Sequence, residues 1–291
     1  TIVRLFAPRK FKERIVYSIR NSYESASKVF YYLDKVLNKK SINIYNSKKS
    51  FVELYAKPSN AVLNNNLIIY NGFDVTRFNS CDRKGNDQLT IGMVGRMTFQ
   101  KNQIQVLRVL SNLKNCIGLK FKFYIIGDSS LDEVVNIKQF INNNNLTNEV
   151  ILLDAQKNIE YYYNKFDVFV MSSIYEGCPN VLFEAMLSKC LCIVSTGANS
   201  DCFIKNGVNG LVYDGTDEML DLKLKEAFDL INKRAANEMI INGQNYAIEN
   251  FSLTTMINKY HKVYKNVLKT WVKKITLCLE EYFGNNLSII F

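Results

Sequence analysis

Short apolar runs alternate with amphipathic stretches along most of the chain. In the second half these runs are almost uninterrupted by polar residues, and they occupy 89–94, 121–126, 150–153, 167–171 and 191–195. Strands of this kind are typically buried on both faces of a sheet. The stretches between them have helical spacing, as in Ile104, Leu107 and Leu110. The pattern therefore predicts an α/β fold with a doubly wound parallel sheet, whose ligands bind at the carboxyl ends of the strands.

The first 80 residues repeat this alternation on a smaller scale. Strands are predicted at 15–19, 42–45 and 67–70, and helices at 24–38 and 48–57. A polar stretch at 79–87 has charges and a glycine but no apolar pattern, which is typical of a linker.

The end of the chain is predicted to be mostly helical, with helices at 217–232, 235–249 and 252–270. The sequence leaves open whether the apolar tail at 275–291 packs onto the rest of the protein or frays. We divide the chain into an incomplete N-terminal Rossmann-like domain at 1–80, a larger domain at 81–255, and C-terminal helices with a tail at 256–291.

The net charge is +10, and the excess of basic residues is uneven. Residues 1–50 hold twelve Lys and Arg against three acids, and residues 251–274 hold six Lys and no acid. Such segments attract phosphate groups. No nucleic-acid-binding motif is present, so a nucleic acid partner is not expected. The alternatives are a solvated basic face and an anionic membrane surface.

The seven cysteines and the single histidine, His261, indicate no metal site. No Cys-x-x-Cys pair occurs, so a Cys/His zinc site is not expected, and reduced thiols in a cytoplasm are the simplest interpretation. No apolar run approaches the roughly 18 residues needed to span a bilayer. We therefore expect a cytoplasmic protein, with a peripheral position on the inner face of the membrane as a hypothesis from charge alone.

The strongest chemical signal is the segment 176–184, which follows the run at 167–171 and opens a helix. Pro179 suits the first helical turn, and Gly177 allows the backbone to bend and a ligand to approach. The free N–H groups of about Asn180 to Leu182 would form an anion site at the helix start. The predicted ligand-binding residues of this segment are Gly177, Cys178, Pro179, Asn180, Val181 and Leu182.

Two glutamates frame this segment. Glu184 interrupts an apolar run, and a buried carboxylate needs a partner, which two sugar hydroxyls could supply. Glu176 lies in the preceding loop, where it could reach a second group on the same ligand. The alternative is that both are ordinary surface acids.

Arg96 and Lys101 follow the run at 89–94, next to Gly95. Two cations between a strand end and a helix start can neutralise a diphosphate without a metal ion, although solvated charges would give the same pattern. Gly127 and Asp128 follow the run at 121–126, where Gly-Asp is often only a turn or a helix cap. No Asp-x-Asp and no Gly-x-Gly-x-x-Gly pattern occurs, so neither a metal-bridged donor site nor a dinucleotide site is indicated.

These motifs resemble those of the family 4 retaining glycosyltransferases, which have the two-Rossmann GT-B fold. The likeness runs from about 14 to 270. It includes three motifs described above, which are Gly95 with Arg96 and Lys101, Gly127 with Asp128, and the Glu-x7-Glu pair of Glu176 and Glu184. Two further segments also match. Residues 71–74 with Phe78 resemble the entry to the donor domain, and 206–212 resemble a stretch before the terminal helices.

The resemblance implies a metal-independent transfer of sugar from a nucleoside diphosphate sugar to a saccharide or lipid-linked acceptor, with retention of configuration, in surface polysaccharide biosynthesis. No cofactor is expected, since the sugar nucleotide is a substrate. By the same resemblance, Arg96 and Lys101 would hold the donor phosphates, Glu184 would bind the ribose, and Glu176 would contact the transferred sugar. Gly95, Gly127, Asp128 and the backbone near Cys178 to Leu182 would complete the donor site.

The chain also departs from the family pattern. Ser129 and Ser130 replace a glycine-containing turn, and 196–201 lacks a second Gly and a Glu. Only about 80 residues precede the donor domain, roughly half the family's usual length, so we expect Thr1 to lie inside the acceptor domain. Two alternatives therefore stay open, which are a truncated nucleotide-sugar-binding module without turnover and a sugar-nucleotide epimerase on the same fold.

Overall fold

The computed structural model describes residues 15–19, 32–33, 36–37, 41–54, 66–78, 88–128 and 131–283. The described residues form two compact units. The first contains those within 1–46, 50–72 and 253–291, and the second contains 47–49 and those within 73–252. The predicted linker at 79–87 lies outside the described residues, and the three-part division made from the sequence stays a prediction.

A six-stranded parallel sheet forms the centre of the second unit. Its strands are β4 (Leu89–Val94), β5 (Phe121–Ile126), β6 (Val150–Leu153), β7 (Val168–Met171), β8 (Leu191–Ser195) and β9 (Leu211–Tyr213). The order is β6-β5-β4-β7-β8-β9. All five predicted strands are confirmed. The three-residue β9 was not predicted, because it follows a Gly-Asn-rich stretch and is too short to show a pattern.

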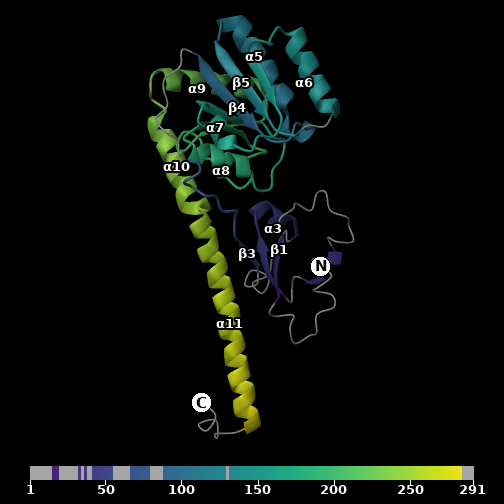
Figure 1. Cartoon of the computed structure of the whole chain (residues 1–291), viewed down its shortest axis with the longest axis vertical. Helices are drawn as coiled ribbons and strands as arrows, with labels where there is room; N and C mark the ends of the chain where they lie inside the picture. The colour runs from purple at the N-terminus through teal and green to yellow at the C-terminus, as the bar shows by residue number, and fades with distance from the viewer. Residues whose placement is uncertain are drawn as a thin grey trace. The chain divides into compact units, whose positions relative to one another are not determined.

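Helices cover both faces of this sheet (Figure 1). On one face, α5 (Gln103–Ile117), α6 (Leu131–Asn143) and α9 (Asp217–Asn232) pack onto apolar side chains such as Ile91, Phe123 and Ile193. On the other face lie α7 (Ile159–Tyr163), α8 (Asn180–Leu187) and α10 (Asn237–Phe251). A short 3-10 helix, η4 (Phe99–Lys101), precedes α5. The predicted doubly wound α/β fold is therefore confirmed.

The strand order fixes where a ligand can bind in this unit. From β4 the chain moves outward through β5 and β6, and then returns to the other side of β4 to form β7. The loops after β4 and β7 consequently leave the sheet in opposite directions. Open α/β sheets bind ligands in the crevice at this switch point, outside the carboxyl ends of the strands.

The first unit is built on a smaller parallel sheet, with β1 (Val16–Ile19), β2 (Ile42–Tyr45) and β3 (Asn66–Ile68) in that order. The third predicted strand ends at Ile68 rather than at residue 70. Helix α3 (Lys48–Leu54) covers the described part of the helix predicted at 48–57. Of the helix predicted at 24–38, residues 32–33 and 36–37 are helical, and the others lie outside the described residues.

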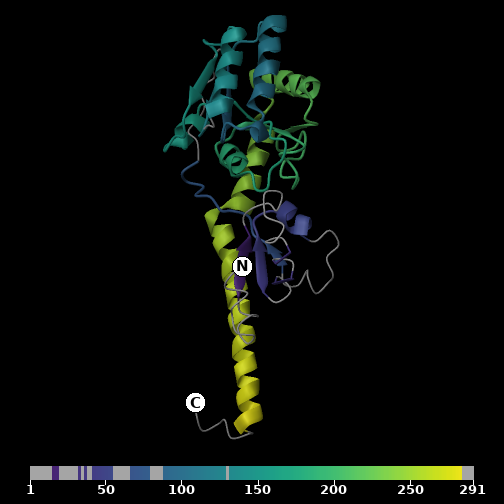
Figure 2. The same cartoon turned by 90° about the vertical axis from the view of Figure 1, so that its right-hand side faces the viewer.

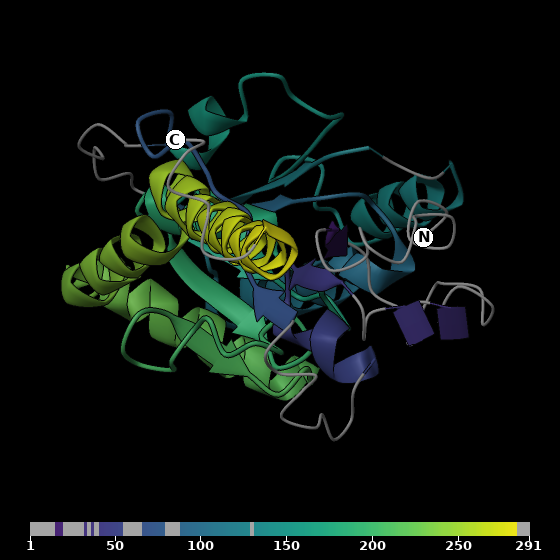
Figure 3. The same ribbon diagram turned by 90° about the horizontal axis from the view of Figure 1, so that it is seen from below.

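Helix α11 (Leu253–Phe283) is the longest helix among the described residues (Figure 2). The sequence predicted its end near 270 and left the tail undecided. The structure corrects this, because no Gly or Pro interrupts the chain before Gly284 and the helix continues to Phe283. Met256, Tyr260, Val263 and Val267 recur at helical spacing and pack against the small sheet, which lies beside the helix in Figure 3.

Candidate functional site

The ends of β4 and β5 meet where the sequence placed Gly95, Gly127 and Asp128. The Gly95 N–H donates to the Ile126 carbonyl (2.9 Å), and the Met97 N–H donates to the Asp128 carbonyl (2.7 Å). A Cβ atom added to Gly127, whose φ is +153°, would lie 2.1 Å from the Gly95 carbonyl oxygen. Only glycine permits this approach of two backbones. The two glycines therefore bring the loops after β4 and β5 into backbone contact.

Lys101 and Glu176 form an ion pair at this same edge of the sheet. Lys101 ends η4 after β4, and Glu176 lies in the loop after β7; their side chains are 15% and 9% exposed. The two loops are also joined by hydrogen bonds from the Ile174 N–H to the Gln100 carbonyl (2.9 Å) and from the Gln100 side chain to the Tyr175 carbonyl (2.8 Å). A nearly buried pair of this kind fixes the position of both charges.

Glu184 is held in place by a different set of contacts. It lies in the second turn of α8, and the Tyr163 hydroxyl at the end of α7 donates to its Oε2 atom (2.9 Å). Burial raises the pKa of Glu184, while the Tyr163 hydrogen bond and the nearby Arg77 oppose that rise. Among the described residues no salt bridge involves Glu184. The carboxylate thus keeps acceptor capacity that one phenol does not fill.

Tyr163 was missed by the sequence analysis, because a five-residue helix gives no usable periodicity. Its ring is fully buried and packs against Phe78, Phe166 and Phe169 at 5.8–6.0 Å between centroids. The Arg77–Glu160 ion pair (2.8 Å) holds the start of α7 beside the same segment. Phe78, which belongs to the motif formed with 71–74, therefore helps to place Glu184 by packing against Tyr163.

The start of α8 differs from the sequence expectation in two ways. Pro179 stands before the first helical residue, with φ −80° and ψ 76°, rather than inside the first turn. The N–H groups of Asn180 and Leu182 donate to the carbonyls of Cys178 and Pro179, both at 3.0 Å. These two groups are therefore engaged within the turn. The prediction that they are free for an anion is wrong in this structure, because the tight turn at Pro179 uses them itself.

Arg96, by contrast, is exposed in the loop after β4, and its carbonyl accepts a hydrogen bond from the Gln103 side chain (3.0 Å). Asp128 is likewise exposed, after β5. Gly177 and Cys178 are half-buried, Val181 is half-buried, and Leu182 is fully buried in the core. Lys101 thus contacts Glu176 directly. Glu184 lies on α8, and its hydrogen bond is to Tyr163 rather than to that ion pair.

Residues 78–250 match the family model described as "Glycosyl transferases group 1", which is more than half of the chain. The chain belongs to the group 1 glycosyltransferases. Two curated relatives are each 25% identical to this glycosyltransferase. One is "UDP-Gal:alpha-D-GlcNAc-diphosphoundecaprenol alpha-1,3-galactosyltransferase" from Escherichia coli, aligned over 73% of this chain and 56% of its own length. The other is "GalNAc-alpha-(1->4)-GalNAc-alpha-(1->3)-diNAcBac-PP-undecaprenol alpha-1,4-N-acetyl-D-galactosaminyltransferase" from Campylobacter jejuni, over 67% and 52%.

Solved structures support the GT-B fold of this group 1 member. Anabaena Alr3699/HepE in complex with UDP is 20% identical, with a TM-score of 0.75 over 86% of this chain and 72% of that chain. A glycosyltransferase from Rickettsia africae ESF-5 is also 20% identical, with a TM-score of 0.74 over 87% and 70%. The transferase described here spans about half the length of the two curated relatives above.

The described residues bear on two further expectations, which concern metal ions and membranes. None of these residues forms a group of three or more His, Cys, Asp and Glu side chains that could hold a metal ion. In the same part of the chain, no helix is both long enough and apolar enough to cross a bilayer. The expected metal independence stays a prediction for the transferase.

Another feature of the second unit was not predicted from the sequence. The Asp201 carboxylate accepts the N–H groups of Lys48 (2.7 Å) and Lys49 (3.1 Å), and the Lys49 ammonium lies 5.0 Å from the centre of the Tyr175 ring. The segment 47–49, which belongs to this unit, is thereby fixed beside the loop that carries Glu176. Asp201 lies in the stretch 196–201, where the sequence departs from the family pattern.

Proposed function

We propose that this group 1 glycosyltransferase moves a sugar from a nucleoside diphosphate sugar to a saccharide or lipid-linked acceptor, with retention and without a metal ion. The observation that carries the proposal is the nearly buried Lys101–Glu176 pair at the switch point of the parallel sheet. A fixed cation and a fixed carboxylate at that edge suit a ligand that combines a diphosphate with hydroxyl groups.

The leaving diphosphate gains negative charge in the transition state. In the proposed mechanism Lys101 and the exposed Arg96 face that charge, and Glu176 accepts a hydroxyl hydrogen bond from the transferred sugar. Charges that are already fixed need no reorganisation when the bond breaks, so they stabilise the transition state more than the ground state. Glu176 also holds Lys101 in place before the donor arrives.

Glu184 is proposed to accept hydrogen bonds from the ribose hydroxyls. Its carboxylate has one phenol partner and is otherwise partly buried, which leaves acceptor positions for two hydroxyl groups. Smaller contributions to donor binding are proposed to come from Gly95, Gly127, Asp128 and the backbone N–H groups of Gly177, Cys178 and Val181.

The acceptor and the base are proposed from the relatives. The Escherichia coli and Campylobacter relatives are named for acceptors linked to undecaprenol through a diphosphate, and the Escherichia coli relative is also named for UDP-Gal. We therefore propose a UDP-sugar donor, a lipid-linked acceptor in surface polysaccharide synthesis, and a cytoplasmic enzyme held at the inner face of the membrane by its basic segments.

Calorimetry with UDP, GDP and ADP tests the donor site. One of them should bind, and Glu184→Ala should weaken that binding by about 1–3 kcal/mol through the loss of charged hydrogen bonds. Lys101→Met and Arg96→Met should weaken binding of the diphosphate and leave the free nucleoside little affected. Unchanged affinity of the Glu184 variant for all three nucleotides, or equal losses for nucleoside and diphosphate, would remove these residues from the site.

A second candidate is a nucleotide-sugar-binding module without turnover. The observation that favours it is that Arg96, Lys101, Glu176 and Glu184 all belong to the second unit, so nucleotide binding needs no residue of the first. Transfer or donor hydrolysis by residues 1–291 would exclude the module, whereas nucleotide binding without either reaction would favour it.

A further inference from the structure

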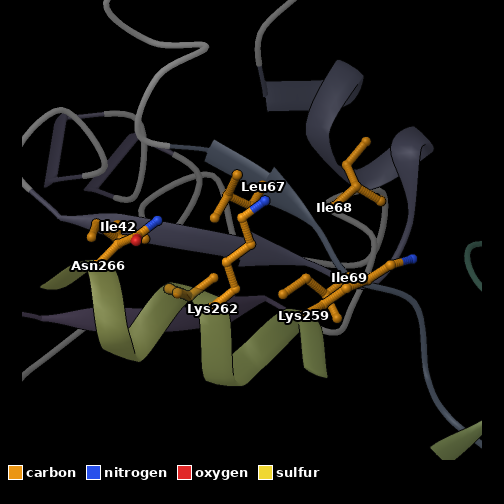
Figure 4. Close-up of a pocket in the computed structure, with 8 residues that line it drawn as sticks. Ile42, Leu67, Ile68, Ile69, Lys259, Lys262 and Asn266 are labelled. Carbon is orange, nitrogen blue, oxygen red and sulfur yellow. The ribbon is translucent and has the colours of Figure 1, made fainter. Parts of the chain in front are cut away.

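A pocket of about 360 Å³ lies in the first unit, and none of the residues proposed for the donor lines it (Figure 4). Its apolar wall comes from Ile42 of β2, from Leu67 and Ile69 at β3, and from Val263 of α11. Two lysines of α11 complete it. In Figure 4 the Lys262 side chain reaches across the pocket toward Leu67, and the Lys259 side chain extends past Ile69.

The two lysines give the described lining of this pocket a net positive charge. Lys259 and Lys262 are three positions apart, so they lie on neighbouring parts of one helix face, and both are exposed. No acid occurs between 251 and 274. Neither lysine takes part in a salt bridge among the described residues. Their apolar stems can lie along the pocket wall while the ammonium groups stay in water.

Apolar walls beside two cations are complementary to one kind of ligand, which is a hydrocarbon chain attached to an anionic group. The volume is at the lower end of the roughly 300–1,000 Å³ typical of small-molecule pockets. It therefore suits the part of a single chain nearest its head group. A diacyl phospholipid would bring two chains to a space of that size.

We propose that this pocket binds the first isoprenoid units of a lipid-linked acceptor, with Lys259 and Lys262 pairing with its diphosphate. The inference rests on the proposed transferase function and names a site for the lipid part of the acceptor. Burial of the isoprenoid chain and pairing of the diphosphate with the lysines act together. The intact isoprenoid diphosphate therefore binds more tightly than either the isoprenoid or the diphosphate alone.

Farnesyl diphosphate, a short isoprenoid diphosphate, serves as the probe for calorimetry on the full chain. It should bind more tightly than farnesol and more tightly than inorganic diphosphate. The Lys259→Gln/Lys262→Gln variant should lose about thirtyfold in affinity, which corresponds to roughly 1 kcal/mol for each lysine near anionic lipid. Leu67→Asn should lower the affinity for farnesol and farnesyl diphosphate but not for inorganic diphosphate.

The matched control is Lys265→Gln/Lys269→Gln, which removes the same charge from exposed positions of α11 that do not line the pocket. It should keep the affinity of the unmodified chain. Equal losses in both double variants would mean that overall charge, and not the pocket, attracts the probe, and the proposal would fail. Inorganic diphosphate binding as tightly as farnesyl diphosphate would also overturn it.

A short-chain phosphatidylglycerol separates the two lipid sources. If this lipid binds more weakly than farnesyl diphosphate, the result supports the lipid-linked acceptor as the ligand. If the two bind equally and both lose the same affinity in the Lys259/Lys262 variant, the pocket would be reassigned to membrane phospholipid. UDP binding is measured on the same samples and should be unchanged in that variant. If UDP and the other nucleotides fail to bind the unmodified chain, the proposed function fails while the result for the pocket still stands.

Discussion

The environment of Glu184 suits the binding of a ligand but lowers the stability of the protein without one. Its carboxylate is partly buried on α8, and its protein partner among the described contacts is the Tyr163 hydroxyl. Burial favours the neutral form of a carboxyl group, and one phenol compensates only part of the lost hydration. A ligand with two adjacent hydroxyls would supply the missing hydrogen bonds, which is why this residue combines a raised pKa with a proposed binding role.

Replacing Glu184 with Gln should therefore stabilise the unliganded protein at neutral pH. The raised pKa means that the folded state binds the proton more tightly than the unfolded state, so stability falls as pH rises through the folded pKa. Gln carries no charge, keeps an acceptor for Tyr163, and removes that penalty. Urea denaturation should show a gain in the free energy of unfolding at about pH 8 that shrinks toward about pH 4.

The control for this variant is Glu226→Gln, whose side chain is 42% exposed and should change stability by no more than about 0.5 kcal/mol. A Glu184→Gln protein that is less stable than the unmodified chain at neutral pH would show that the carboxylate already has sufficient partners, and the argument for its spare acceptor capacity would be lost.

Tyr163 and Tyr161 offer a matched comparison on the same short helix. Tyr163→Phe removes the donor to Glu184 and should cost about 1–3 kcal/mol, because a partly buried carboxylate then loses its partner. Tyr161 is 57% exposed, so Tyr161→Phe should stay within about 0.5 kcal/mol. Denaturation at neutral pH measures both, and similar costs for the two variants would mean that the Tyr163 hydroxyl does not hold Glu184.

At the scale of elements, the candidate site depends on how the strand ends meet. The loops after β4 and β5 touch through Gly95 and Gly127, and the loops after β4 and β7 are joined by the Lys101–Glu176 pair. Parallel strands place all of their carboxyl ends at one edge, so loops far apart in the chain become neighbours there. The site is thus assembled by the sheet, and each loop contributes one or two groups.

Two glycines test this dependence on backbone contact. Gly127→Ala would bring a Cβ to 2.1 Å from the Gly95 carbonyl oxygen, whereas Gly118→Ala, at φ +66°, would meet nothing within 4 Å. The first should cost about 3 kcal/mol from overlap and backbone strain, and the second about 1 kcal/mol from strain alone. Thermal melts measure both, and a Gly127 variant as stable as the Gly118 variant would show that the two loops have room to separate.

At the scale of the whole molecule, the net charge of +10 produces an electric field that extends beyond the protein surface. Four exposed lysines, Lys259, Lys262, Lys265 and Lys269, follow one another along α11 in the described structure. Such a field attracts anionic surfaces over about one Debye length, roughly 10 Å at 0.1 M salt. In the proposed function, this attraction brings the protein to a membrane, where the proposed lipid pocket binds its ligand.

Flotation with lipid vesicles tests this attraction. The chain should bind vesicles that contain phosphatidylglycerol, binding should fall as salt is raised from low to high concentration, and vesicles of phosphatidylcholine alone should bind little. Binding that is indifferent to both anionic lipid and salt would contradict a membrane role for the basic segments.

The sequence by itself determined the fold class, the strands β4 to β8 and the stretches that hold the candidate site. Uninterrupted apolar runs can be satisfied only by burial on both faces, and Gly, Pro and charged residues directly after them mark the strand ends. Only the tertiary structure decided the strand order, the existence of β9 and α7, the length of α11, and the partners Lys101–Glu176 and Tyr163–Glu184. The physical reason is that short elements and buried polar pairs take their stability from neighbours distant in the chain, and a local pattern carries no information about those neighbours.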